Sequence, residues 1–332
     1  MDKIVKASAL AKNGLAKDLD DYYNNRKPNP EMKDLSGYII KGVDVGKKRM
    51  KDIYPDYPLI DLTTTRIKQE DLDFGGYRVR RFYPHDLDDA SPSIVFFHGG
   101  SFMGGYIENY NCIHRKLAEL IHGNVFHVDY SLSPEAAYPT ALIQCYHTVE
   151  YIARNHEQFK VDTDKLAVYG NSAGGYLVAS ACLLDRENHY IKQAFMMYPV
   201  VDMTEYSLSK FDYSFYGEDL DEFVKGKIKS LLNYRSILDI YLQNNEDPKD
   251  ELISPLLSDN LKDFPHTIIM SSEFDVTRMQ SEEFRDKLRS AGVKTDYYLF
   301  EGTTHGFLDK LGILESSLKS LEIISETIKG QL

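Results

Sequence analysis

The chain has no tryptophan and only three cysteines in 332 residues, Cys112, Cys145 and Cys182. The number is odd and no C-x-x-C occurs, so the sequence predicts neither a disulfide framework nor a zinc site. The ten histidines include no H-E-x-x-H pair, which leaves no recognisable metal-ligand spacing. Each cysteine lies among apolar neighbours in an expected helix, so we expect buried free thiols. No metal and no cofactor is predicted.

Long hydrophobic runs and an excess of positive charge are also missing. No run approaches 18 apolar residues, and the first residues show no secretory signal pattern, so no membrane span is predicted. The net charge of −12 disfavours nucleic acid and anionic membrane surfaces as partners. We therefore expect a cytoplasmic protein that binds neither nucleic acid nor a membrane.

The sequence does contain a regular alternation of strand and helix patterns. Apolar runs predict strands at 93–97, 124–128, 165–169, 193–198, 267–270 and 296–300, and helical patterns lie between them. Upstream, 62–67 and 77–83 predict a hairpin with its turn at 74–76. This order predicts an α/β fold, with a mostly parallel central sheet and helices on both faces, as a single domain over 1–332.

Two segments interrupt this order. Residues 1–55 are charged and helix-prone, and they precede every strand that we predict. Residues 203–255 are rich in aromatic residues, and an insertion of that size is often a lid over a site. The alternative is a pair of helices that extends the core, with most of the aromatic side chains fixing the insertion to its domain.

The most informative motif is Gly170-Asn171-Ser172-Ala173-Gly174, which lies between the apolar run 166–169 and a helix of small residues. This context predicts a nucleophile elbow, a sharp turn from strand to helix that exposes a serine hydroxyl. Glycine at 170 and 174 removes Cβ atoms that would collide with neighbouring backbone. The alternative is a glycine-serine turn that only joins two elements.

A serine nucleophile needs a histidine to take its proton and a carboxylate to orient that histidine. In this architecture the chain order is serine, acid, histidine. Asp275 follows the strand 267–270 and His305 follows 296–300, so both are expected at the sheet edge that carries Ser172. Glu273 is a rival carboxylate, and the alternative role of Asp275 is a helix N-cap. His266 precedes its strand and is expected at the opposite edge.

The oxyanion of a tetrahedral intermediate needs hydrogen-bond donors. The amide of Ala173 begins a helix, where backbone N–H groups have no partner within the helix. Gly99 and Gly100 follow the strand 93–97 and are expected to turn their amides toward the elbow. His98, just before them, is expected to hold this loop in place.

The ordered set of motifs resembles the bacterial hormone-sensitive-lipase-like esterases of the α/β-hydrolase superfamily. The motifs are His98-Gly99-Gly100-Ser101-Phe102, residues 129–135, Gly170 to Gly175, Ser254-Pro255-Leu256, Asp275 and His305-Gly306-Phe307. The resemblance implies a catalytic triad of Ser172, Asp275 and His305, and oxyanion donors at Gly99, Gly100 and Ala173. It also implies a helical cap built from 1–55 and 203–255. The chain departs from the family at Ser101, where a third glycine is usual, and at Asn171, where an acidic residue or threonine is usual.

The function that this resemblance implies is a serine carboxylesterase that hydrolyses small, short-chain acyl esters through an acyl-enzyme. A sugar O-deacetylase or an amidase is the nearest alternative, because both use the same three side chains. A non-catalytic small-molecule receptor on the same scaffold is a more distant one, since the chain retains His305. A homodimer is one assembly that the resemblance allows.

Overall fold

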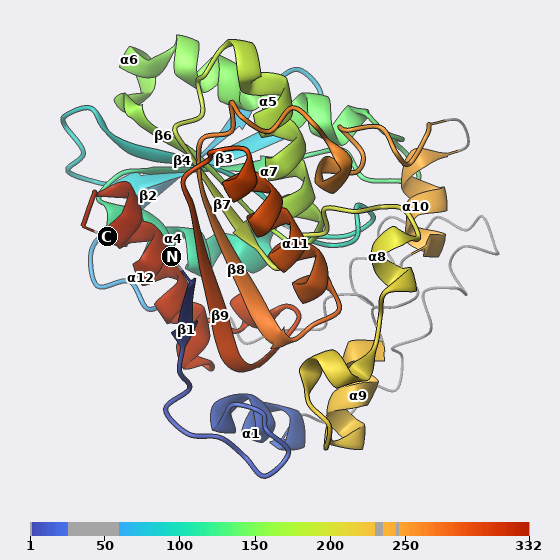
Figure 1. Ribbon diagram of the computed structural model, residues 1–332. Coiled ribbons are helices and arrows are strands. Elements are labelled where there is room, and N and C mark those ends of the chain that lie inside the picture. Colours follow the sequence, from blue (N-terminus) through green and yellow to red (C-terminus); the bar gives the residue numbers. More distant parts are fainter. Residues whose placement is uncertain (1, 26–59, 106, 230–234, 244–245, 332) are drawn as a thin grey trace.

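The computed structural model describes residues 2–25, 60–105, 107–229, 235–243 and 246–331 (Figure 1). In this part of the chain a nine-stranded sheet has the order β1-β9-β8-β7-β6-β4-β5-β3-β2. The strands are β1 (Asp2–Val5), β2 (Ile67–Asp73), β3 (Arg78–Pro84), β4 (Ser91–Phe97), β5 (Asn124–Asp129), β6 (Val161–Asn171), β7 (Gln193–Met197), β8 (His266–Phe274) and β9 (Thr295–Thr304). Only β3 runs antiparallel to its neighbours, so the predicted, mostly parallel sheet is confirmed.

Helices cover both faces of the sheet (Figure 1). On one face lie α5 (Thr140–Arg154), α6 (His156–Phe159), α7 (Ala173–Leu184) and α11 (Thr277–Ser290), which share one apolar cluster. On the other face α4 (Asn111–Ile121) packs against α12 (Glu315–Ile328) in a second cluster. Because β6 lies between β4 and β7 and is covered on both faces, its run from Leu166 to Gly170 is entirely buried and apolar. Among the described helices, none has the length and apolarity to cross a bilayer.

The predicted strand 62–67 is wrong, although the hairpin turn after it is confirmed. The strand begins only at Ile67, and the turn closes with Phe74 N donating to the carbonyl of Tyr77 at 3.0 Å. The threonines before Ile67 are held by a side chain instead, because the amides of Thr64 and Thr65 each donate to Oε1 of Glu119 at 2.7 Å.

The carboxylate of Glu119 on α4 accepts several hydrogen bonds. Burial raises the pKa of Glu119, but hydrogen bonds from Lys116 and from both threonines outweigh this effect and bring the pKa to about 2. The threonine hydroxyls also contact Oε1, at 3.0 and 2.9 Å. The carboxylate therefore ties the segment before β2 to α4.

The prediction that residues 1–55 precede every strand is also wrong. Asp2–Val5 forms β1, which pairs in parallel with Tyr297–Phe300 of β9 at the edge of the sheet. Four residues carry too little pattern to predict a strand, and Ile4 is still 58% exposed. The partner strand, nearly three hundred residues away, selects the extended conformation.

The two segments predicted as a cap meet where they are described. After β1 the chain forms α1 (Lys17–Asn25), and the insertion forms α8 (Tyr206–Ser209), η3 (Tyr213–Tyr216), α9 (Glu222–Lys229) and α10 (Arg235–Leu242). Tyr23 of α1 packs edge-on against Phe223 of α9, with ring centroids 5.5 Å apart. Residues 26–55, 230–234 and 244–245 of the predicted cap lie outside the described residues.

The remaining helical turns are η1 (Ile107–Tyr110), η2 (Asp185–Glu187), η4 (Pro255–Leu257) and η5 (Phe307–Lys310). Cys145 and Cys182 are buried free thiols as predicted, whereas Cys112 on α4 is partly exposed. The prediction for Cys112 is therefore wrong, because its position lies beside the buried stripe of this amphipathic helix.

Candidate active site

The strand-turn-helix arrangement around Ser172 has the geometry of an elbow. Ser172 lies between β6 and α7 with φ 56° and ψ −118°, a conformation that costs a residue with a Cβ about 1–3 kcal/mol. A Cβ at Gly170 would lie 2.3 Å from the carbonyl oxygen of Gly174, and a Cβ at Gly174 would lie 1.9 Å from that of Phe97. The turn therefore requires both glycines, and Ser172 is partly exposed there.

Three side chains from three strand ends meet at this turn. Nε2 of His305 lies 2.8 Å from Oγ of Ser172, and Nδ1 of His305 lies 2.6 Å from Oδ2 of Asp275. Because parallel strands place their carboxyl ends at one edge, residues that follow β6, β8 and β9 come together there. Asp275 is fully buried, whereas 19% of the His305 side chain is exposed.

The hydrogen bonds determine the tautomer of His305. The buried carboxylate of Asp275 only accepts, so Nδ1 of His305 carries the proton and donates it. Nε2 then presents its lone pair to the hydroxyl of Ser172. This is the protonation state in which an imidazole acts as a general base.

Asp275 also contacts the start of α11, although the N-cap residue of this helix is Val276 and not Asp275. Oδ1 accepts a hydrogen bond from the amide of Thr277 at 2.9 Å, at the start of α11. The phenol of Tyr216 donates to the backbone carbonyl of Asp275 at 2.9 Å. Both oxygens of the carboxylate are thus fixed, one by the helix start and the other by the histidine.

The rival residues have other partners. Oε2 of Glu273 accepts from the amide of Gly302 in β9, at 2.7 Å. Nε2 of His266 lies 2.7 Å from Oδ2 of Asp296, and both residues are at the starts of their strands. The structure therefore places neither of them at the elbow.

The three predicted oxyanion donors are not equivalent. The amide of Gly99 donates to Oδ1 of Asn171 at 2.9 Å, so the prediction of this amide as a free donor is wrong. Within the described residues, the amides of Gly100 and Ala173 have no acceptor. The amide of Ser101, which was not predicted as a donor, is also without an acceptor there.

The role of Asn171 as the hydrogen-bond partner of the loop after β4 was not predicted. It is buried at the end of β6, directly before Ser172, and its amide group also donates to the hydroxyl of Tyr110 at 3.3 Å. A side chain at the last position of a central strand faces the neighbouring strand end, here the loop that follows β4. The polar residue directly after the buried run 166–170 was the available signal, because buried amides need hydrogen-bond partners.

His98 holds the loop, as expected. Its Nδ1 lies 2.8 Å from the carbonyl oxygen of Gly99, and its ring stacks on Tyr130 at 4.0 Å. Nearby, Nε2 of His114 lies 2.9 Å from Nδ1 of His127. Burial lowers the pKa of all three histidines, to about 3 for His114, so they are neutral packing residues at ordinary pH.

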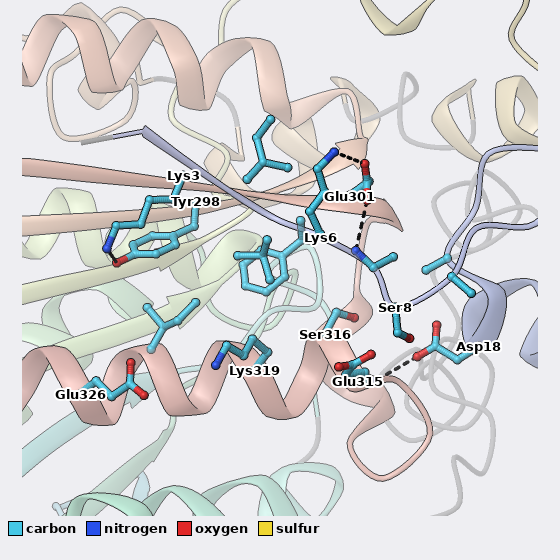
Figure 2. A pocket seen from close by; sticks show the side chains of 17 residues that line it. Lys3, Lys6, Ser8, Asp18, Tyr298, Glu301, Glu315, Ser316, Lys319 and Glu326 are labelled. Carbon is cyan, nitrogen blue, oxygen red and sulfur yellow. Dashed lines mark hydrogen bonds and ion pairs between the residues drawn. The ribbon is translucent and has the colours of Figure 1, made fainter.

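A cavity of about 400 Å³ lies elsewhere, between β1, β9 and α12 (Figure 2). Ile4, Phe300 and Ile323 contribute apolar lining, and Lys6 forms an ion pair with Glu301 at 2.5 Å. None of the three hydrogen-bonded residues at the elbow lines this cavity. In the part of the chain that the structure describes, no group of three or more histidine, cysteine or acidic residues is arranged to hold a metal ion.

Comparisons with known proteins agree with the fold. A sequence profile described as alpha/beta hydrolase fold matches residues 94–309. The arylesterase of Saccharolobus solfataricus is 30% identical over 255 residues, which cover 76% of this chain and 79% of that protein. An acetyl esterase of Salmonella typhi is 27% identical over 255 residues, covering 74% of this chain and 73% of the other.

Solved structures give the same result. An arylesterase structure has a TM-score of 0.77 at 23% identity and covers 96% of this chain and 99% of its own, which shows the shared fold. A thermostable carboxylesterase cloned from a metagenomic library has a TM-score of 0.71 at 28% identity, covering 82% and 92%. The region that the sequence profile matches runs from β4 through the elbow to η5. The chain therefore belongs to the alpha/beta hydrolase fold family, among its hormone-sensitive-lipase-like esterases.

Proposed function

We propose that the protein is a serine carboxylesterase that hydrolyses small, short-chain acyl esters, with Ser172, His305 and Asp275 as its catalytic residues. The observation that carries the proposal is the unbroken chain of hydrogen bonds from Oγ of Ser172 through both nitrogens of His305 to the buried Asp275, at 2.8 and 2.6 Å. The names of the relatives, arylesterase and acetyl esterase, support the ester as the substrate class.

In this mechanism Oγ of Ser172 attacks the acyl carbon while Nε2 of His305 takes the hydroxyl proton. Asp275 accepts from Nδ1 throughout and stabilises the imidazolium. The amides of Gly100, Ser101 and Ala173 donate to the oxyanion of the tetrahedral intermediate. The imidazolium then protonates the leaving alcohol, and water attacks the acyl-enzyme with the same histidine as base. This releases the acid and regenerates the serine.

We also propose that α1 and the insertion form a cap over this site. Two contacts support it, each beside a residue of the proposed triad. The hydroxyl of Tyr23 in α1 lies 2.8 Å from Oγ1 of Thr304, directly before His305. The phenol of Tyr216 in the insertion donates to the carbonyl of Asp275. A cap that closes on these positions limits the size of the acyl group.

The test compares wild type with Ser172→Ala on p-nitrophenyl esters from acetate to decanoate. We expect wild type to prefer the shortest chains, and the variant to lose about six orders of magnitude in kcat, because the residues of a triad act as a unit. Equal rates for the two proteins would end the proposal. A preference for decanoate would retain the mechanism and overturn the short-chain assignment.

A sugar O-deacetylase and an amidase stay alternatives, since both reactions use the same three side chains. Turnover of an acetylated sugar or an anilide at a higher kcat/KM than p-nitrophenyl acetate would favour one of them. A receptor without a working base would label slowly with a fluorophosphonate probe, whereas we expect rapid labelling at Ser172. The cytoplasmic location and the homodimer stay predictions, and size-exclusion chromatography tests the latter.

A further inference from the structure

The loop after β4 holds a backbone conformation that its sequence does not favour. Ser101 and Phe102 have φ values of 55° and 61°, in the left-handed region that side chains with a Cβ rarely adopt. The carbonyl of Gly100 accepts from the amides of Met103 and Gly104, at 3.0 and 2.8 Å, which closes the loop into a tight turn. Contacts outside the loop must hold such a conformation in place.

The two halves of the loop are anchored to different parts of the molecule. The first half is fixed to the sheet, because the amide of Gly99 donates to Asn171 at the end of β6. The second half is fixed through Phe102, whose carbonyl accepts from the amide of Ser133 at 2.9 Å. Gly100 and Ser101, whose amides have no acceptor among the described residues, lie between these two anchors.

The ring of Phe102 is held by two tyrosines. It stacks on Tyr241 with centroids 3.8 Å apart and planes 12° from parallel. Tyr176 meets it edge-on, at 5.3 Å and 88°. All three side chains are buried, with at most 3% exposed. A buried ring that is packed on its face and at its edge holds its place, and with it the backbone that carries it.

Tyr241 reaches this loop from the insertion, because it belongs to α10. The helix is attached to the chain before α5, where the amide of Tyr138 donates to the carbonyl of Tyr241 at 2.9 Å. The phenol of Tyr176 donates to the carbonyl of Leu252, so the same cluster also holds the end of the insertion. One aromatic cluster therefore joins the insertion, α7 and the loop after β4.

We propose that Tyr241 is a positioning residue that acts through Phe102 to aim the amides of Gly100 and Ser101 at the elbow. The proposal rests on the proposed function, in which this loop donates to the oxyanion. When α10 is displaced, the loop relaxes toward ordinary backbone conformations and the hydrogen bonds to the transition state weaken. Binding of the ester in its ground state depends less on these amides, so the effect falls on kcat.

The test compares Tyr241→Leu with Tyr241→Phe on p-nitrophenyl acetate. The leucine removes the stacked ring, and we expect kcat to fall about 10- to 100-fold, less than the loss of a complete oxyanion donor. We expect KM to stay within about threefold and the pH profile of kcat/KM to keep its shape, because His305 is untouched. The phenylalanine retains the ring and is expected to retain kcat within about twofold.

A transition-state analogue separates positioning from general damage. For a trifluoromethyl ketone that adds to Ser172, we expect the affinity for Tyr241→Leu to fall in proportion to kcat/KM. Phe102→Leu removes the same contact from the loop side, and the double variant is expected to lose no more than the worse single variant. Phe102→Leu by itself also carries the test if Tyr241→Leu does not fold. Tyr151→Leu is the control. Tyr151 lies on the outer helix α5, and the variant removes its edge-on ring contact with Phe74.

An unchanged kcat or an unchanged analogue affinity in both single variants would overturn the proposal, as would an effect confined to KM. Additive losses in the double variant would also overturn it. These outcomes differ from a failure of the proposed function, in which wild type would not depend on Ser172 at all.

Discussion

Replacing Asp275 by asparagine tests the proposed mechanism at its most buried point. The carboxylate accepts twice, from the amide of Thr277 at 2.9 Å and from Nδ1 of His305 at 2.6 Å. An asparagine of the same shape has one acceptor and one donor end. If its oxygen accepts from Thr277, its NH2 group faces His305, so the imidazole shifts its proton to Nε2 and cannot take one from Ser172.

The magnitude follows from the hydrogen bonds. The productive tautomer needs a proton on Nδ1 of His305. The NH2 group of the asparagine then faces an N–H group, either that of His305 or that of Thr277. Two buried donors therefore face each other. Each unsatisfied group costs about 1–3 kcal/mol, so the active arrangement is disfavoured by about 2–6 kcal/mol. Loss of the charge that stabilises the imidazolium adds to this. We expect kcat/KM to fall by about four orders of magnitude, equivalent to about 5–6 kcal/mol.

The assay is hydrolysis of p-nitrophenyl acetate, with thermal unfolding to show that the variant is folded. Glu273→Gln is the matched control, because it exchanges a carboxylate for an amide two residues away, where the partner is the amide of Gly302. We expect it to retain activity within about tenfold. A folded Asp275→Asn variant that keeps more than about 1% of wild-type kcat/KM would refute the reasoning.

Three further predictions follow from single contacts. Asn171→Ala removes the acceptor for the amide of Gly99, and we expect kcat to fall about tenfold or more. Asn171→Asp keeps the acceptor and is expected to keep most of the activity. Equal rates for the two variants would contradict this prediction. Gly174→Ala places a Cβ 1.9 Å from the carbonyl oxygen of Phe97. We therefore expect the free energy of unfolding, measured in urea, to fall by about 1–3 kcal/mol. Unchanged stability would be evidence against a tight elbow. Glu119 has a pKa lowered to about 2, so its carboxylate stabilises the fold above the ordinary pKa near 4.5 and loses this effect as pH falls toward 2. Glu119→Gln should therefore destabilise the protein by about 1–3 kcal/mol at pH 7, with the difference narrowing in acid; a constant difference would argue against this linkage.

Much of the site could be predicted because its chemistry is encoded locally. The apolar run before Gly170, the glycines of the elbow and the small residues after it predict a strand, a sharp turn and a helix without reference to the rest of the chain. Asp275 and His305 followed from chain order, because parallel strands gather their carboxyl ends at one edge.

Where the prediction from the sequence is wrong, a residue far away in the chain decides the conformation. Asp2–Val5 is a strand because β9 offers it hydrogen bonds, and the threonines before Ile67 are not, because Glu119 binds their amides. The amide of Gly99 is occupied because Asn171, seventy-two residues later, reaches it.

The sequence by itself determined most of the order of strands and helices, the sharp turn at Ser172 and the two residues that meet Ser172 there, because these depend on periodicity, glycine sterics and residue chemistry over a few positions. The tertiary structure alone decided which backbone amides stay free and what fixes the loop that carries them. Hydrogen bonds and ring contacts between remote segments form only after the chain has folded, so no local pattern contains them.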